Sequence, residues 1–123
     1  LKQNHKSFVR IAIPGLFAPW NREAFKKEIE SSTSVALQMR TQGIIAALEG
    51  MKIREDMTGV LEMDTLQKML IIGKADPALD LDSLLVQSKI EGVRSITFED
   101  GHMSHIANEA ELINALQEFV NRF

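Results

Sequence analysis

Asp76 and His102 are the two residues of this chain whose types and positions point most directly to chemistry. Asp76 follows the apolar run at 68–73, and His102 follows an alternating run at 94–99. An aspartate that accepts a hydrogen bond from one imidazole nitrogen fixes the tautomer of the ring. It also stabilises the imidazolium that forms when the other nitrogen takes a proton. The pair is therefore a candidate general base with its orienting acid.

The elements that must position this pair are two strands and the helix between them. The run KMLIIG at 68–73 is continuously apolar and ends at glycine, which is typical of a buried parallel strand. The run RSITFE at 94–99 alternates, as a half-exposed or edge strand does. Residues 82–90 between them are expected to form a helix with Asp82 as its N-cap. This order predicts a right-handed crossover that joins two parallel strands.

Parallel strands bring their carboxyl ends to one edge of a sheet, where ligands collect in open α/β folds. Neighbouring strands lie about 5 Å apart, so the loops that follow them can touch. We therefore expect a hydrogen bond between Asp76 and His102. Two simpler interpretations stay open. A loop histidine can be merely solvated, and an aspartate before Pro77 is a common turn residue.

The first half of the chain predicts helices around an irregular stretch. The segment IAIPGLFAPWN at 11–21 holds two prolines and a glycine, too many for a regular element. Asn21 is expected to cap a helix at 22–30. Residues 33–50 predict one or two helices that stop at Gly50.

The end of the chain predicts an amphipathic helix. Its apolar side chains fall on one stripe, which comprises Leu112, Ile113, Leu116, Phe119, Val120 and Phe123. Asn108 and Glu111 have the spacing of a capping box at the start of this helix.

Composition excludes several classes of protein. The 123 residues suit one domain, and 14 Lys and Arg among 17 Asp and Glu give a net charge of −3, so no basic face for nucleic acid is expected. No apolar run approaches the roughly 18 residues that a membrane span needs. Cysteine is absent, and a cytoplasmic location is expected. His102 and His105 lack a third ligand cluster, so neither a metal nor another cofactor is predicted.

Several other residues have two interpretations each. His105 could help to position the histidine loop, although a structural or solvated role is expected. Asp80 and Asp82 are alternative acids, although a loop surface explains Asp80 better and a helix cap explains Asp82 better. Leu16, Phe17 and Trp20 could line an acyl pocket, although core packing explains them as well.

Two strands are too few for a stable parallel sheet. An apolar strand such as 68–73 would keep one unpaired edge, which is an aggregation hazard. We therefore expect further strands upstream of Leu1, or strands that another chain supplies. The sequence would then be the tail of a larger α/β protein.

The order of these features resembles the C-terminal half of the α/β-hydrolase superfamily. The matching stretches are LIIGKADP, GHMSHIANEAELINALQEFV and AALEGMKIRED. The resemblance implies that residues 1–32 are part of a helical lid and that residues 33–123 are the C-terminal part of the core. It assigns Asp76 as the triad acid and His102 as the general base, in the family's order of nucleophile, acid and histidine.

The chain departs from this family at two points. None of its serines stands in a G-x-S-x-G frame, so the nucleophile and oxyanion hole are expected upstream. Ala107 and Glu109 stand where many relatives carry Glu and Pro, which puts the capping of the last helix in doubt.

The resemblance implies hydrolysis of small-molecule esters or amides in the parent protein, without a cofactor, and an inactive chain when residues 1–123 stand alone. Dehalogenase, perhydrolase, lyase or non-catalytic receptor members of the same fold are alternatives. A further alternative is a self-sufficient module that binds a partner through its sheet edge. The expected partner is the missing N-terminal half, or a second copy in a homodimer.

Overall fold

The computed structural model describes residues 4–122 as a mixed α/β arrangement around a two-stranded parallel sheet. Strand β1 is Lys68–Gly73 and strand β2 is Val93–Phe98, with Lys68 opposite Val93 and Gly73 opposite Phe98. The sequence predicted the first strand with these bounds and the second one residue too late. Helix α4 (Leu81–Gln87) connects them, so the predicted crossover between parallel strands is confirmed.

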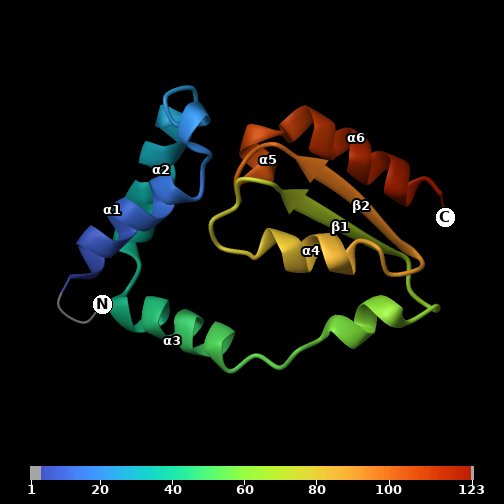
Figure 1. The fold of residues 1–123 in the computed structure, drawn as a ribbon. Coiled ribbons are helices and arrows are strands. Elements are labelled where there is room, and N and C mark those ends of the chain that lie inside the picture. Colours follow the sequence, from blue (N-terminus) through green and yellow to red (C-terminus); the bar gives the residue numbers. More distant parts are fainter. Residues whose placement is uncertain (1–3, 123) are drawn as a thin grey trace.

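Helices cover both faces of this sheet. Successive strand residues point to opposite faces. Leu70 lines a cavity together with Gln87 of α4, whereas Ile71 lines a different cavity together with Leu112 of α6. Helix α4 and helix α6 (Glu109–Val120) therefore lie on opposite faces of β1, as Figure 1 shows. A short helix α5 (Ser104–Ala107), which the sequence did not predict, precedes α6.

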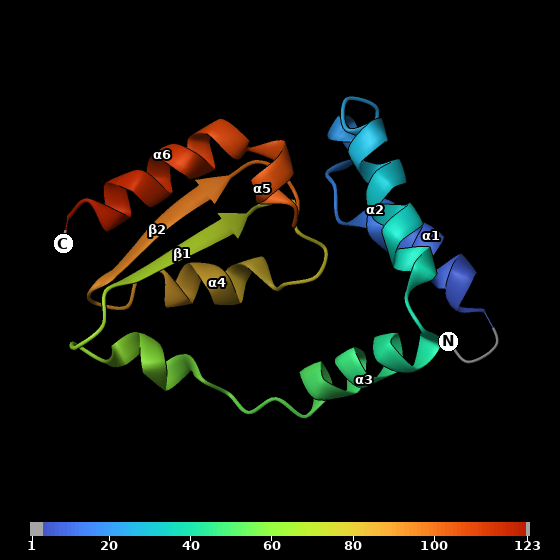
Figure 2. The same ribbon diagram turned by 180° about the vertical axis from the view of Figure 1, so that it is seen from behind.

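The first half of the chain is helical and lies beside the sheet. It contains α1 (His5–Gly15), the 3-10 turn η1 (Pro19–Asn21), α2 (Lys26–Gln38), α3 (Thr41–Lys52) and the 3-10 turn η2 (Thr58–Glu62). Helices α1 and α2 pack together, whereas α3 and η2 form an arc that leads back to β1 (Figures 1 and 2). The predicted boundary between lid and core, after residue 32, falls inside α2. Residues 1–3 of the predicted lid lie outside the described residues.

The prediction of an irregular stretch at 11–21 is wrong for residues 11–15, which belong to α1. Pro14 is inside the helix, but it stands in the last turn. Pro14 has no amide hydrogen for the Arg10 carbonyl, so it removes one backbone bond in the last turn, and the helix ends one residue later. The amide groups of Leu16 and Phe17 then bond to the carbonyl groups of Ile13 and Pro14, which closes the turn.

Two predicted helix caps are wrong, and a third has the predicted N-cap position without the capping hydrogen bond. Helix α2 begins at Lys26, so Asn21 lies too early to cap it, and its side chain bonds Asp100 instead. Asp80, not Asp82, caps α4, because the Asp80 carboxylate accepts from the Ser83 amide at 2.9 Å. Asn108 precedes α6, yet its side chain caps nothing. Each of these asparagine and aspartate residues has a side chain that can cap a helix. Whether it does so depends on where the backbone enters the helix.

Two further predictions concern the bounds of helices. Residues 33–50, predicted as one or two helices, belong to the two helices α2 and α3, which an extended backbone at Met39 and Arg40 separates. Helix α3 then continues past Gly50 to Lys52. The predicted stripe of the last helix belongs to α6, except for Phe123, which lies outside the described residues.

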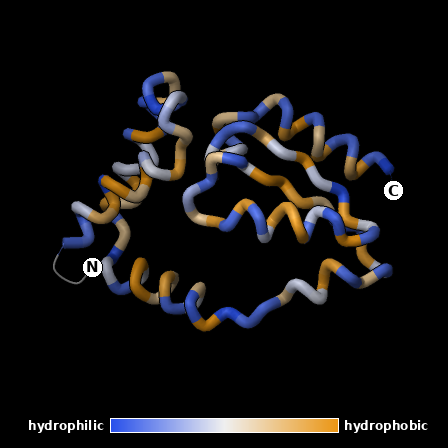
Figure 3. The backbone as a smooth tube through the Cα atoms, in the orientation of Figure 1, coloured by the Kyte–Doolittle hydropathy of each residue, from blue (hydrophilic) through white to orange (hydrophobic). Residues whose placement is uncertain are grey.

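The core of the described chain is small. Its buried apolar residues are Val9, Phe17, Ala18, Ile72, Phe98 and Ala115. Many large apolar side chains stay exposed, including Ile11, Met51 and Ile53 on the helical part. Figure 3 shows apolar segments along α3 as well as along β1. Within residues 4–122, no helix has the length and apolar character that crossing a membrane requires.

Candidate active site

The candidate site lies where the chain leaves β1 and β2. The two strands keep pairing beyond their regular ends, because the Lys74 amide donates to the Phe98 carbonyl at 2.9 Å and the Ala75 amide donates to the Asp100 carbonyl at 3.0 Å. These two bonds hold the first residues of the two loops next to each other. The next residues of the loops are Asp76 and, two positions beyond Asp100, His102.

The structure brings Asp76 and His102 together. The Nδ1 atom of His102 lies 2.7 Å from the Oδ2 atom of Asp76. Only 6% of the Asp76 side chain is exposed, whereas 42% of the His102 side chain is. The acid is therefore enclosed and the ring that it holds is open to solvent. The contact expected from the parallel strand ends is present, and its partners are 26 positions apart in the sequence.

The Asp76 carboxylate is held from both sides. Its Oδ1 atom accepts from the Ala78 amide at 2.7 Å, which makes the turn that begins before Pro77. The backbone amide of Asp76 donates to the Gly73 carbonyl at 3.2 Å. The turn interpretation and the pairing with His102 are thus compatible, because each uses a different oxygen. A carboxylate fixed in this way holds its partner ring in one orientation.

The chemistry of the pair determines which ring nitrogen of His102 carries the hydrogen. An ionised carboxylate only accepts hydrogen bonds, so His102 Nδ1 carries the hydrogen and Nε2 has the free lone pair. Within residues 4–122, Nε2 has no hydrogen-bond partner. A neutral imidazole with its Nδ1–H on a carboxylate has its Nε2 lone pair available to accept a proton. This arrangement suits a general base.

A cavity of about 250 Å³ opens beside the pair. His105 and Ser104 contribute polar groups to it, and its apolar walls come from Ile71, Leu79 and Leu112. The sequence did not indicate that His105 faces the same cavity as His102. Among the described residues, no group of three or more histidine, cysteine, aspartate or glutamate side chains is arranged to hold a metal ion.

A salt bridge flanks the site, and sequence reasoning missed it. Lys74 and Glu99, which directly follow the two strands, form an ion pair across the strand ends. Both side chains are largely exposed, so the pair contributes little to stability. The only signal for it was the position of each residue at the end of a strand.

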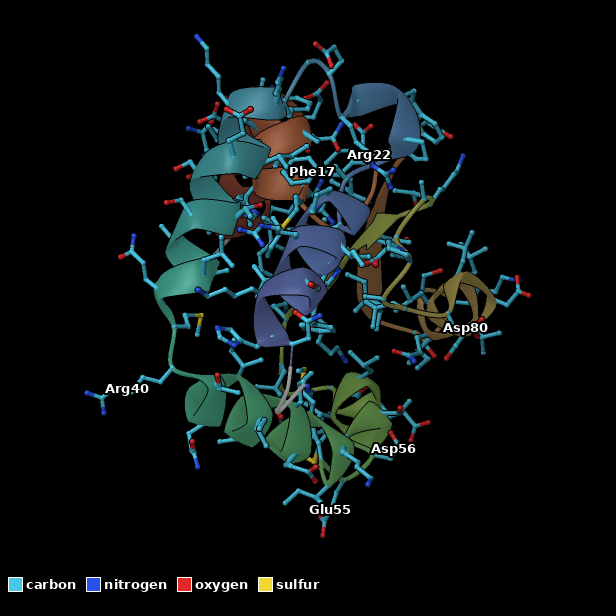
Figure 4. All side chains as sticks on the ribbon, turned by 90° about the vertical axis from the view of Figure 1, so that its left-hand side faces the viewer. Phe17, Arg22, Arg40, Glu55, Asp56 and Asp80 are labelled. Carbon is cyan, nitrogen blue, oxygen red and sulfur yellow. The ribbon has the colours of Figure 1, made fainter. Side chains whose placement is uncertain are left out.

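The residues proposed for an acyl pocket divide between core and surface. Phe17 is 1% exposed, and its ring centroid lies 6.1 Å from that of Phe25. The Arg22 side chain donates from Nε to the Phe17 carbonyl at 3.3 Å, and Figure 4 shows the two residues together at one end of the helical part. Trp20 is 64% exposed. Core packing therefore explains Phe17, and Trp20 lies on the surface.

A second cavity, of about 550 Å³, lies elsewhere, beside η2. Asp56 lines it and accepts two hydrogen bonds from Thr58, from Oγ1 at 2.6 Å and from the amide at 2.9 Å. Both hydrogen bonds lower the pKa of this exposed carboxyl, and the bond from the hydroxyl has the larger effect. The cavity has no histidine, and the bonds of Asp56 are those of a local turn, so it offers no catalytic arrangement.

No protein-family model matches this chain, and no curated protein is significantly similar to it.

Proposed function

We propose that this chain is the C-terminal part of an α/β-hydrolase that cleaves small-molecule esters or amides. The observation that carries the proposal is the hydrogen bond between Asp76 and His102 at the carboxyl ends of adjacent parallel strands. Acid and histidine follow each other in the order that this superfamily uses, and an amphipathic helix follows the histidine. The sequence resemblance and the geometry support the same pair.

The proposed reaction begins at a nucleophilic hydroxyl that residues outside this chain supply. His102 Nε2 takes the hydroxyl proton while the oxygen forms a bond to the substrate carbonyl carbon. The imidazolium then gives that proton to the leaving alcohol or amine as its bond to carbon breaks. Asp76 stays ionised and stabilises the imidazolium. A water molecule repeats the sequence to release the acid, and no cofactor takes part.

The sheet itself supports a missing half. Within residues 4–122, β1 pairs only with β2, so its other edge offers free amide and carbonyl groups. Exposed apolar side chains such as Ile11, Met51 and Ile53 would gain cover from further structure. We propose that the N-terminal half of the same fold covers this edge and these side chains. A second copy of the chain, paired edge to edge, is the alternative.

The test uses the complete product of the gene that encodes this chain. We expect p-nitrophenyl ester turnover that a His102→Gln variant loses and a His105→Gln variant keeps. We also expect a fluorophosphonate probe to label one serine outside residues 1–123. His102-independent turnover, or an absence of both turnover and labelling, would overturn the proposal.

The covalent adduct separates the other members of this fold. An ester formed on an upstream aspartate would indicate dehalogenase or epoxide chemistry instead of a serine hydrolase. A folded product that binds small molecules but forms no adduct would indicate a receptor.

The stand-alone module makes a different prediction for the isolated chain. A self-sufficient module would be a monomer in size-exclusion chromatography with light scattering. The missing-half proposal predicts that isolated residues 1–123 self-associate and have no esterase activity above a His102→Ala control. A stable monomer with His102-dependent turnover would contradict it.

A further inference from the structure

The turn at residues 16–21 follows α1 and includes η1. This turn lies directly against the loop that carries His102. The His102 amide donates to the Leu16 carbonyl at 2.8 Å. The next two residues of the turn, Phe17 and Ala18, are among the most buried of the described chain. The backbone of the candidate base is therefore tied to a segment more than 80 residues earlier in the sequence.

Gly101 allows this approach. A Cβ atom at position 101 would lie 2.5 Å from the Leu16 carbonyl oxygen and 3.0 Å from the Ala18 amide nitrogen. Both neighbours are backbone atoms, so neither can rotate away as a side chain would. The φ angle of Gly101 is not positive. Among the described residues, Gly92 is the glycine with a positive φ angle. Space, not backbone conformation, explains the glycine before His102.

A side-chain contact closes the same junction. Asn21 Nδ2 donates to the Oδ1 atom of Asp100. Asp100 is 8% exposed, and a buried carboxylate is unfavourable unless a donor faces it. The Asp100 carbonyl also accepts from Ala75, the residue before Asp76. A single residue thus connects Asn21 to the loop of the acid and to the loop of the histidine.

We propose that Asn21 is a positioning residue, which acts through Asp100 to keep the His102 ring on the Asp76 carboxylate. The catalytic consequence rests on the proposed hydrolase function, whereas the positioning itself does not. The side chain of Asn21 bonds Asp100, whereas that of His102 bonds Asp76, so Asn21 acts on the pair indirectly. Its place in the helical part makes that part a support for the site, and the helical segment would then influence turnover.

The chain offers a reciprocal test of this contact. Asn21→Asp places two carboxylates against each other, so the histidine loop should loosen. Adding Asp100→Asn restores the bond with donor and acceptor exchanged. Asn114→Asp, on the exposed surface of α6, introduces the same change of charge away from the junction.

Two measurements on the complete gene product report the outcome. Hydrogen–deuterium exchange follows the peptide that covers residues 99–106, and proton NMR follows the Nδ1–H signal of His102, assigned by its loss in His102→Gln. For Asn21→Asp we expect about tenfold faster exchange and a lost or shifted signal, because a hydrogen bond to a charged group is removed. The double variant should restore both, and Asn114→Asp should change neither.

A structural role alone predicts something different. It would lower the unfolding midpoint of Asn21→Asp without changing the Nδ1–H signal of the folded protein, and that result would overturn the proposal. Failure of the reciprocal variant to restore the signal would overturn it too. If the positioning is right and the hydrolase function is wrong, the signal responds as described while ester turnover is absent from every variant. If both are right, Asn21→Asp lowers kcat more than it changes KM, and the double variant recovers kcat.

Discussion

Asp76 and His102 meet because the loops after β1 and β2 continue to pair once the regular strands have ended. Two backbone bonds, from Lys74 to Phe98 and from Ala75 to Asp100, precede the contact of 2.7 Å between the carboxylate and the ring. The position of the pair therefore depends on the sheet more than on the loops. If the pair is catalytic, as proposed, its placement by the sheet reduces the reorganisation that is needed when substrate arrives.

Replacing Asp76 with asparagine tests the role of the acid. An amide can donate to Nδ1 and so favour the tautomer that has its hydrogen on Nε2, which cannot accept a proton there. We expect kcat of the complete gene product to fall about 10³- to 10⁴-fold, the size of effect known for such changes in hydrolase triads. Ester turnover measures it, with His105→Gln as the control that lines the same cavity. Wild-type kcat in Asp76→Asn would contradict the assigned role.

Gly73, the last residue of β1, lies against the backbone of the loop that follows β2. A Cβ atom at this position would meet the carbonyl oxygens of Gly101 and Asp100, the second at 2.8 Å. Because both obstacles are backbone, we expect Gly73→Ala to lower the free energy of unfolding by about 1–3 kcal/mol. Urea unfolding of the complete gene product, followed by circular dichroism, checks this value.

Gly43 supplies the matched control for that substitution. It lies inside α3, and an added Cβ atom would meet nothing within 4 Å. Gly43→Ala should therefore raise the free energy of unfolding by about 0.5–1 kcal/mol, through reduced freedom of the unfolded chain. Equal effects of the two substitutions would show that crowding at Gly73 is not what matters.

Sequence patterns predicted the strands and the contact between acid and base, because both depend on short-range periodicity and on a general rule of parallel sheets. The apolar composition of 68–73 is enough to predict a strand, although Ile71 is 39% exposed in the described chain. Strand order then brings Asp76 next to His102. These inferences needed no knowledge of the path of the rest of the chain.

The caps and the support of the histidine loop could not be predicted in this way. Asn21 has the right chemistry for a helix cap, but its partner Asp100 is 79 residues away, and only the tertiary fold brings the two together. Asp80 and Asp82 are equally good caps by type, so the choice depends on where the backbone turns into α4. Local propensity cannot distinguish such positions.

The cap of α4 can be tested directly. Asp80 accepts from the Ser83 amide, so Asp80→Ala should lower the free energy of unfolding by about 0.5–2 kcal/mol. Asp80→Asn keeps an accepting oxygen and should have a much smaller effect. Asp82→Ala removes only a favourable charge in the first turn, at about 0.3–1 kcal/mol. Chemical denaturation of the three variants ranks them, and a larger effect at Asp82 than at Asp80 would return the cap to the position that the sequence suggested.

Asp56 supplies a prediction about pH that is independent of the candidate site. Its hydrogen bonds from Thr58 favour the ionised form and lower its pKa below the ordinary value for aspartate. A group whose pKa is lower in the folded state stabilises the fold above the pKa of the unfolded chain. That contribution disappears as the pH falls through the folded-state pKa, so the turn before η2 should loosen only in acid.

The hydroxyl of Thr58 is the larger cause of this shift, and its amide is the smaller one. Thr58→Val removes the hydroxyl and keeps the amide, so the pKa of Asp56 should rise toward the ordinary value without reaching it. Carbon-13 NMR of the Asp56 carboxyl measures the midpoint in both proteins. Thr58→Ser, which keeps a hydroxyl, should leave the midpoint near that of the wild type. An unchanged midpoint in Thr58→Val would mean that the amide alone accounts for the shift.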